Sequence, residues 1–246
     1  MIVGSIKEDL TLEKRVSITP ETSKNIIGLG LKVCIEKNYA THLGIDDNEY
    51  KKTGVEIKDS SNEVLSSSNL IIKVNCPSEN EISLLKEKTI LIGMLNPSKN
   101  KSQIDKIIKK KVKTFSLELL PRITRAQSMD VLSSQSNLAG YRAVIDCVAE
   151  FEKAVPMMMT AAGTVPAAKV LVIGAGVAGL QAIATAKRLG AIVSATDVRT
   201  ASKEQVESLG GKFLTVEQAE DMETAGGYAK EASEDYKKKT NWNDEG

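Results

Sequence analysis

A short run of glycines between two apolar segments has the residue types and spacing best suited to chemistry. The apolar run Lys169–Ile173 leads directly into Gly174-Ala175-Gly176-Val177-Ala178-Gly179, and an alanine-rich helical pattern follows it. A second apolar run, 191–196, ends at Asp197. This order of strand, glycine turn, helix, strand and acid is the fingerprint of a dinucleotide-binding βαβ unit. The alternative, a glycine-rich turn that binds nothing, is disfavoured because every part of the pattern is in register.

Each residue of the turn has a physical role in that interpretation. Gly174 permits the tight turn out of the strand, and Gly176 has no side chain to block a pyrophosphate. Gly179 lets the helix pack closely against the strand. Val177 belongs to the same predicted binding set, because it lies where the helix begins and free N–H groups face the phosphates.

The acid at the end of the second strand predicts which dinucleotide is bound. Asp197 is placed to accept hydrogen bonds from the hydroxyls of the adenosine ribose. A 2′-phosphate beside this carboxylate would be repelled, so NAD(H) is favoured over NADP(H). Arg199 is interpreted as a solvated surface arginine rather than as a partner for a phosphate.

Composition limits the remaining classes of function. With 246 residues and 41% apolar content, the chain is long enough for two domains. A net charge of +1 gives no argument for nucleic acid or an anionic membrane. Three cysteines without a CxxC motif suit a reducing compartment, and no segment is expected to cross a membrane. His42 is the single histidine, and no metal site is expected.

The chain before the fingerprint alternates strand and helix patterns, which indicates a parallel sheet covered by helices. Strands are expected at 2–6, 32–35, 70–74, 90–93 and 114–116, and helices starting near 20, 62, 79 and 101. Thr19 is expected to cap the first of these helices, with Pro20 in its first turn. A polar stretch follows at 121–137, and a helix is expected at 138–155, capped by Ser136 or Asn137. Its apolar stripe would consist of Leu138, Tyr141, Ile145, Val148 and Phe151.

We therefore expect an α/β fold of two doubly wound domains with a boundary near Gln135. Residues 1–135 would form a flavodoxin-like α/β domain, and 136–246 a partial Rossmann NAD-binding domain. After Asp197, a helix at 202–209 and a strand at 212–216 complete only the adenine-side half. The nicotinamide-side half is missing from this pattern, so the strand at 169–173 would have an unpaired edge.

Three stretches of sequence resemble a known family. They are 121–130 (PRITRAQSMD), 133–142 (SSQSNLAGYR) and 223–229 (ETAGGYA). With the N-terminal segments 7–8 and 15–20, they are similar to the soluble NAD(H)-binding domain of the alpha subunit of proton-translocating NAD(P) transhydrogenase. The resemblance runs from Met1 to about residue 239 and does not include the second half of the nucleotide domain.

The resemblance implies a catalytic set formed by Arg122, Gln127, Asp130 and Ser133. These residues would hold the nicotinamide end of NADH against NADP⁺ bound on a partner domain. Direct hydride transfer moves no proton at that step, so alignment of the two rings matters more than an acid or a base. Tyr228, in the last of the three stretches, would close over the NAD site.

The resemblance also implies the setting of the protein. Membrane-spanning and NADP-binding transhydrogenase subunits would be its partners, and protons crossing the membrane would drive the reaction. The chain would form a homodimer and lie in the cytoplasm, peripheral to the inner membrane.

Two other functions stay open at this point. An alanine-dehydrogenase-like enzyme would use Lys73 for its substrate, but the position of the catalytic histidine of such an enzyme aligns near Asn96. The second alternative is a truncated, catalytically inactive fragment that binds NAD weakly or acts only in assembly.

Overall fold

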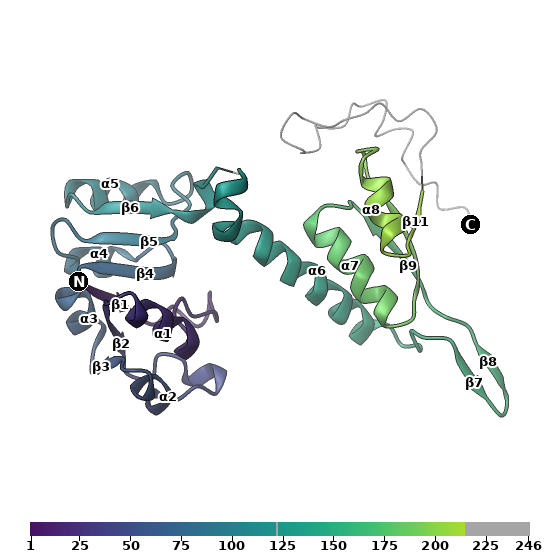
Figure 1. Ribbon diagram of the computed structural model, residues 1–246, viewed down its shortest axis with the longest axis horizontal. Coiled ribbons are helices and arrows are strands. Elements are labelled where there is room, and N and C mark those ends of the chain that lie inside the picture. The colour runs from purple at the N-terminus through teal and green to yellow at the C-terminus, as the bar shows by residue number, and fades with distance from the viewer. Residues whose placement is uncertain (122, 215–246) are drawn as a thin grey trace. The chain divides into compact units, whose positions relative to one another are not determined.

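The computed structural model describes residues 1–121 and 123–214 of the chain. The chain divides into two compact units, Met1–Val131 and Leu132–Gly246. The expected boundary at Gln135 lies a few residues beyond this division, inside the helix that begins at Val131. Figure 1 colours the chain by residue number and labels most elements of each unit with the names used below.

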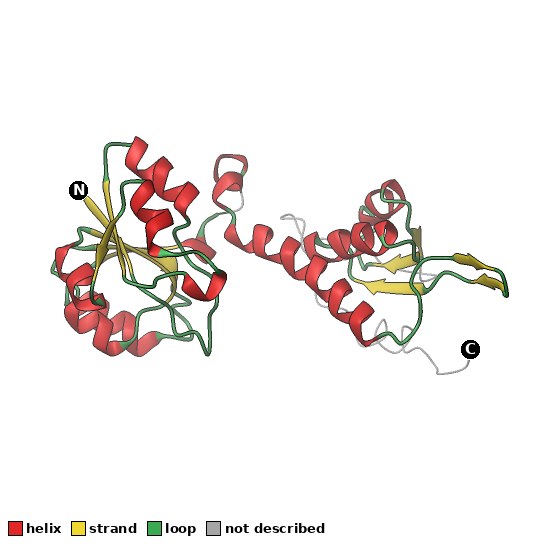
Figure 2. Ribbon diagram, turned by 90° about the horizontal axis from the view of Figure 1, so that it is seen from below, coloured by secondary structure: helices red, strands yellow, loops and turns green. Residues whose placement is uncertain are grey.

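The first unit is built on a parallel sheet of six strands in the order β3-β2-β1-β4-β5-β6. The strands are β1 (Ile2–Ser5), β2 (Lys32–Glu36), β3 (Glu56–Lys58), β4 (Leu70–Asn75), β5 (Ile90–Met94) and β6 (Lys113–Ser116). The helices are α1 (Pro20–Gly28), α2 (Asp47–Lys52), α3 (Ser61–Ser67), α4 (Glu79–Leu84) and α5 (Lys101–Lys109). Figure 2 shows strands and helices of this unit in separate colours.

The strand order corrects the flavodoxin-like expectation for this unit. The observed order is the 3-2-1-4-5-6 arrangement of a Rossmann fold. The five strands expected from sequence occupy the flavodoxin-like order, and β3 (Glu56–Lys58) adds a sixth strand at the edge beside β2. This strand is short and carries two charged residues, which is why its apolar pattern was too weak to detect.

Local signals explain where the helices of the first unit begin. The α1 helix starts with Pro20, and Thr19 forms the expected N-cap through a capping box with Thr22. The α2 helix, which sequence analysis missed, is capped in the same way by Asp46 and Glu49. Its charged sequence hides the single buried residue, Tyr50, that anchors it to the core.

Both faces of the six-stranded sheet are buried. One face packs Val3, Val33 and Ile35 against α1 and α2. Neighbouring strand residues point the other way, and this face packs Cys34, Ile71 and Leu91 beneath α3, α4 and α5. The first unit is therefore doubly wound, as expected from the alternating pattern.

The second unit contains a smaller parallel sheet in the order β11-β10-β9. Its strands are β9 (Lys169–Ile173), β10 (Ile192–Thr196) and β11 (Lys212–Phe213), and a separate hairpin joins β7 (Met158–Thr160) to β8 (Gly163–Val165). Its helices are α6 (Val131–Glu150), α7 (Val177–Arg188) and α8 (Ser202–Ser208). This order is that of the adenine-side half of a Rossmann fold, in agreement with the sequence pattern.

Helix α6 differs from the expected helix at both ends. It begins at Val131, so the polar stretch before Leu138 is largely helical and neither Ser136 nor Asn137 is a cap. The proposed apolar stripe is also wrong in part, because Leu138, Tyr141 and Phe151 are exposed. Within α6, the buried positions are Gly140 and Val144, so the helix packs through a small residue.

Candidate nucleotide-binding site

The glycine turn joins β9 to α7 in the geometry that its sequence predicts. Gly174 has a φ of +93°, which only glycine adopts without strain, and its N–H donates to the carbonyl of Thr196 at 2.8 Å. Gly176 occupies the N-cap position of α7, and none of the side chains that the structure describes caps the first turn. The N–H groups of that turn are thus left to an external acceptor, as in phosphate-binding helices.

Two glycines bring backbone segments into direct contact around this turn. A Cβ on Gly179 would overlap with the carbonyl oxygen of Gly174, so α7 can approach β9 only with glycine at this position. A Cβ on Gly140 would overlap with the carbonyl of Ala178, and α6 crosses the first turn of α7 at this point. Sequence analysis gave Gly179 this role but missed Gly140.

Space is open in front of Gly176. Among the described residues, the one atom within 4 Å of a Cβ built here is the Arg199 guanidinium nitrogen Nη2, at 3.9 Å. The position therefore accommodates a group at the N-terminus of α7 without displacing protein backbone. An uncapped helix turn, a glycine that leaves space and a positively charged neighbour form a donor set that suits a pyrophosphate.

The Asp197 carboxylate is held in place by the turn and by Arg199. One oxygen, Oδ2, accepts from the Ala175 N–H at 2.7 Å, and Oδ1 accepts from the Arg199 N–H at 2.8 Å. The guanidinium completes a fork, with Nε donating to Oδ1 at 2.9 Å and Nη2 to Oδ2 at 3.0 Å. The interpretation of Arg199 as a solvated surface residue is thus wrong.

This arrangement sets the charge of Asp197. Burial opposes its ionisation, but the hydrogen bonds from Arg199 and the Ala175 N–H outweigh it and lower the pKa of Asp197 below its ordinary value. The carboxylate is ionised, and its acceptor positions are filled by protein donors. A ribose hydroxyl that binds Asp197 would therefore share an oxygen with the Arg199 guanidinium or replace it.

The remaining predicted site residues are distributed over both units. Gln127 is exposed in a 3₁₀ segment, Thr124–Met129, and Asp130 follows it, its N–H donating to the Gln127 carbonyl at 3.3 Å. Both belong to the first unit, whereas Ser133 lies on α6 in the second. Arg122 and Tyr228 lie outside the described residues.

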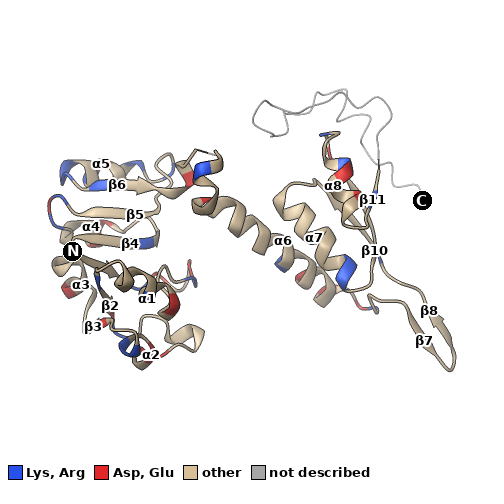
Figure 3. Cartoon of the chain, viewed as in Figure 1, with Lys and Arg blue, Asp and Glu red and all other residues tan. Residues whose placement is uncertain are grey.

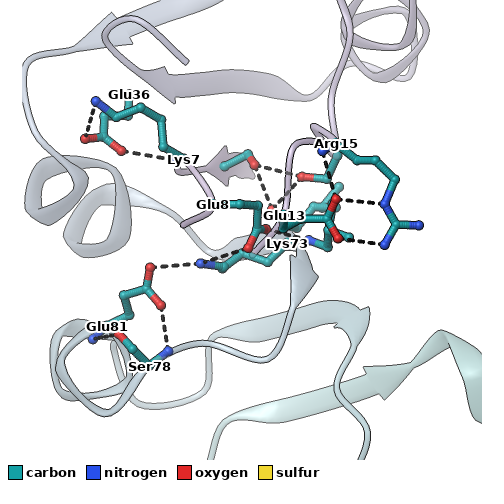
Figure 4. A network of polar contacts seen from close by, with 12 residues as sticks. Lys7, Glu8, Glu13, Arg15, Glu36, Lys73, Ser78 and Glu81 are labelled. Carbon is teal, nitrogen blue, oxygen red and sulfur yellow. Dashed lines mark hydrogen bonds and ion pairs between the residues drawn. The ribbon is translucent and has the colours of Figure 1, made fainter. Parts of the chain in front are cut away.

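A second polar cluster, which sequence analysis did not predict, lies at the carboxyl ends of β1 and β4 in the first unit (Figure 4). The Lys73 ammonium is buried, donates to Glu81 Oε1 at 2.8 Å and lies 3.5 Å from Glu8 Oε2. The other Glu8 oxygen accepts from the Val74 N–H at 2.7 Å.

Burial of Glu8 outweighs the nearby Lys73 charge and raises the pKa of its carboxyl. Close by, Arg15 makes a two-pronged ion pair with Glu13, at 2.9 Å and 2.7 Å. Lys73 and Arg15 are therefore both engaged with carboxylates of the chain itself.

Strand order, glycine turn and anchored acid together define a Rossmann-type dinucleotide-binding class of protein. Two family profiles match the chain: the N-terminal domain of alanine dehydrogenase/PNT over residues 4–139 and the C-terminal domain over 143–239. The chain belongs to the alanine dehydrogenase/PNT family.

Proteins that are similar to the chain support this family assignment. A component of NAD(P) transhydrogenase subunit alpha from Rhodospirillum rubrum is 52% identical, and the protein of the same name in Rickettsia prowazekii is 49% identical; each match covers 97% of the chain. A crystal structure of transhydrogenase from Sinorhizobium meliloti aligns with a TM-score of 0.84 at 51% identity, over 88% of the chain. The chain spans 64% of the Rhodospirillum protein, 63% of the Rickettsia protein and 64% of the Sinorhizobium chain.

Membrane spans and metal clusters are both absent from the described part of the chain. Among residues 1–121 and 123–214, no helix is both long enough and apolar enough to span a bilayer. Within the same ranges, no cluster of three or more histidine, cysteine or acidic residues is arranged to hold a metal ion.

Proposed function

We propose that this chain is the NAD(H)-binding component of a proton-translocating NAD(P) transhydrogenase. Bound NADH would pass a hydride to NADP⁺ held on a partner domain. The observation that carries the proposal is the uncapped first turn of α7, which opens at Gly176 beside the anchored carboxylate of Asp197. The high identity to components of transhydrogenase subunit alpha supports the same function.

The residues of the chain would bind and orient the dinucleotide. The N–H groups at the start of α7 would receive the pyrophosphate, and Asp197 would receive the adenosine ribose. Gln127, Asp130, Ser133 and Arg122 would hold the nicotinamide end, with Tyr228 closing over it. Hydride transfer between two nicotinamide rings requires that the rings are aligned and that water is excluded. Fixed hydrogen bonds supply the alignment, and the transfer needs no acid or base.

Selection of NAD(H) over NADP(H) does not depend on charge alone. Arg199 balances the charge of Asp197, so simple repulsion of a 2′-phosphate by the carboxylate is weakened. The ionised carboxylate of Asp197 still favours a ribose hydroxyl, because a hydroxyl can donate a hydrogen bond to it in place of Arg199 and a phosphate cannot. We propose NAD(H) here and NADP(H) on the partner domain.

The setting of this function is also a proposal. Membrane-spanning and NADP-binding subunits would be the partners, and the chain would lie in the cytoplasm, peripheral to the inner membrane.

The β7–β8 hairpin supports a homodimer, because it carries no charged residue (Figure 3) and its Met159 is 84% exposed. Exposed apolar segments of this kind mark protein contacts, and Met159→Asp should shift the chain towards monomer in sedimentation velocity.

NADH titration tests the binding step. We expect tryptophan or nicotinamide fluorescence to report saturable binding by the wild-type chain, and Gly176→Val to weaken it because the new side chain fills the space before α7. The matched control is Gly28→Ala, where an added Cβ meets no atom within 4 Å. Equal affinities for all three proteins would refute the binding site.

A hydride-exchange assay tests the reaction. The chain is mixed with a purified NADP-binding component of a transhydrogenase, and transfer between NADH and an NADP⁺ analogue is followed by absorbance. Gln127→Asn shortens the side chain and should slow transfer while leaving NADH affinity nearly unchanged. If neither protein shows transfer, the catalytic proposal fails for this chain, even if NADH binds.

The structure weakens the alanine-dehydrogenase-like alternative, and one feature supports the inactive-fragment alternative. An alanine-dehydrogenase-like site needs a cation for the substrate carboxylate, yet Lys73 is balanced by Glu8 and Glu81. His42 is exposed and its ring contacts the Lys14 carbonyl at 2.8 Å. The inactive-fragment alternative is favoured by exposed apolar residues on the second sheet, such as Ile173 and Ile192.

A further inference from the structure

Lysines gather at one edge of the first unit, where β5 and β6 begin. Two short segments form this edge: residues 86–88 lead into β5, and residues 109–113 lead from α5 into β6. We call these two segments the lysine edge. They contain six lysines and one glutamate, a charge of +5, whereas the whole chain carries only +1. Figure 3 shows these basic segments at the left of the view, and the small net charge of the chain hides their concentration there.

The sheet holds the two segments of the lysine edge side by side. Parallel pairing places Ile90 of β5 opposite Lys113 of β6, and the Lys113 N–H donates to the Thr89 carbonyl at 2.9 Å. An ion pair of 2.9 Å joins the Lys111 ammonium of one segment to Glu87 of the other. The lysine edge is therefore one surface rather than two separate runs of charge.

Most of these charges are not neutralised by the protein itself. Lys110 anchors the end of α5 by donating to the Leu85 carbonyl at 2.9 Å, and Lys111 is paired with Glu87. Within residues 1–121 and 123–214, no ion pair is formed by the other four: Lys86, Lys88, Lys109 and Lys113. All four are exposed, so the edge presents a positive surface to solvent.

Two of the lysines stand where the backbone disfavours a side chain. Lys88 has a φ of +66° and Lys111 a φ of +55°, in the left-handed region that glycine and asparagine usually occupy. Among the described residues other than glycine, the only others with a positive φ are Asn38 and Asn96. Glycine would relieve the strain at both lysine positions. Strain of this kind is concentrated at functional sites, which indicates a use for these two charges.

The composition of the lysine edge distinguishes among anionic partners. It contains no arginine and no aromatic residue, whereas protein interfaces are enriched in both and depleted in lysine. Single-stranded nucleic acids stack their bases on aromatic side chains, which the edge lacks. Beside Lys109 on α5, Ile108 is 64% exposed, although its neighbour Ile107 is buried in the core. A bilayer surface suits this combination, because headgroup charges attract lysines and the interface accepts an apolar side chain.

We propose that the lysine edge docks on the surface of a bilayer that contains anionic phospholipids. The four lysines without an ion pair in the described part of the chain face the headgroup phosphates, and Ile108 enters the headgroup layer. Each lysine near such a surface adds to the attraction, which falls off within a Debye length. This docking concerns the first unit and does not depend on the proposed nucleotide binding.

Co-sedimentation of the chain with vesicles tests the docking. The probes are vesicles of equal parts phosphatidylglycerol and phosphatidylcholine, and vesicles of phosphatidylcholine alone. Nucleotide and partner subunits are omitted, so a failure of the proposed NADH binding would not alter the result. At low ionic strength we expect the chain to bind the anionic vesicles at least about tenfold more tightly than the neutral ones. Addition of about 0.5 M salt should release it, because the charges are then screened.

Replacing the two strained lysines separates docking from folding. Lys88→Gly/Lys111→Gly should weaken binding to anionic vesicles at least about tenfold, because two charges leave the surface. Its melting temperature should be unchanged or higher, since glycine suits the left-handed backbone. The matched control is Lys24→Gln/Lys51→Gln, which removes two exposed lysines from α1 and α2 and should bind nearly as tightly as the wild type.

Ile108→Gln should weaken binding to the anionic vesicles at least about threefold, because an apolar side chain no longer enters the interface. The proposal is overturned if the wild-type chain does not bind anionic vesicles at low ionic strength, or binds both kinds of vesicle equally. It is also overturned if the glycine variant binds like the wild type or if the glutamine control loses as much affinity. Tighter binding to a DNA duplex than to vesicles at the same phosphate concentration would show that the partner is a nucleic acid instead.

Discussion

The Cα of Gly179 lies so close to the carbonyl oxygen of Gly174 that a side chain at position 179 would overlap with this oxygen. The contact fixes the first turn of α7 against the end of β9, and with it the direction in which the N–H groups of that turn point. Strand, turn and helix therefore form one rigid element, and its geometry requires that residue 179 has no Cβ.

Gly179→Ala should lower the stability of the second unit by about 1–3 kcal/mol, because the new Cβ forces backbone atoms apart. NADH affinity should fall as well, since α7 moves away from its position. Urea unfolding followed by circular dichroism and NADH titration measure the two effects. Gly28→Ala lies near the end of α1 in open space, and this control should be neutral or slightly stabilising. Unchanged stability of Gly179→Ala would contradict the close-packing argument.

Asp197 should make stability depend on pH in the acid range. Its pKa in the folded chain is below the ordinary value of 3.8, so the ionised form is the one that folding favours. The contribution is complete above the unfolded pKa and is lost as the pH falls through the lower folded pKa. The stability difference between wild type and Asp197→Asn should thus be constant above about pH 5 and shrink below about pH 4.

Urea unfolding at closely spaced pH values from strongly acidic to neutral checks this dependence on Asp197. Asp105→Asn removes an exposed carboxylate and serves as the matched control. A difference between wild type and Asp197→Asn that grew on acidification would show that the Arg199 fork does not favour the ionised carboxylate.

Lys73 should act as a structural cation in the first unit. Lys73→Met leaves Glu8 buried without its ammonium partner and should destabilise the unit by about 3–5 kcal/mol. The double variant Lys73→Met/Glu8→Gln removes both charges and should recover part of that loss. Unfolding in urea measures all three proteins. If Lys73 instead served a substrate carboxylate, Lys73→Met would fold normally and the addition of L-alanine or pyruvate would stabilise only the wild type.

The three cysteines should differ in reactivity. Burial raises the pKa of the Cys76 thiol to about 11, so at about pH 8 only about one molecule in a thousand carries the reactive thiolate. Cys147 is exposed and Cys34 is buried. Iodoacetamide at that pH should therefore label Cys147 well before Cys76, and peptide mass spectrometry identifies the sites. Faster labelling of Cys76 would mean that its burial is incomplete.

Much of this fold could be predicted from local patterns. The strand before Gly174, the helix after Gly176 and the acid at Asp197 each have a signature that depends on neighbours in sequence, and the structure places them as expected. The N-cap at Thr19 is another such case. Elements with short or charged sequences, such as β3 and α2, were missed because their apolar anchors are too few to show a period.

Long-range contacts could not be predicted. Gly140 packs against Ala178 across two helices, and nothing in the sequence near Gly140 signals that approach. The cluster of Lys73, Glu8 and Glu81 joins residues on different elements. Arg199 is the instructive exception, since it stands two residues after Asp197 and its pairing with that acid was within reach of a local argument.

The uncovered apolar face of β9 and β10 has a consequence for the life of the chain in a cell. Leu171, Ile173 and Ile192 are exposed in the described residues, and chaperones and proteases act on apolar side chains that a fold leaves exposed. The half-life of the protein in a cell should therefore depend on how fully this face is covered.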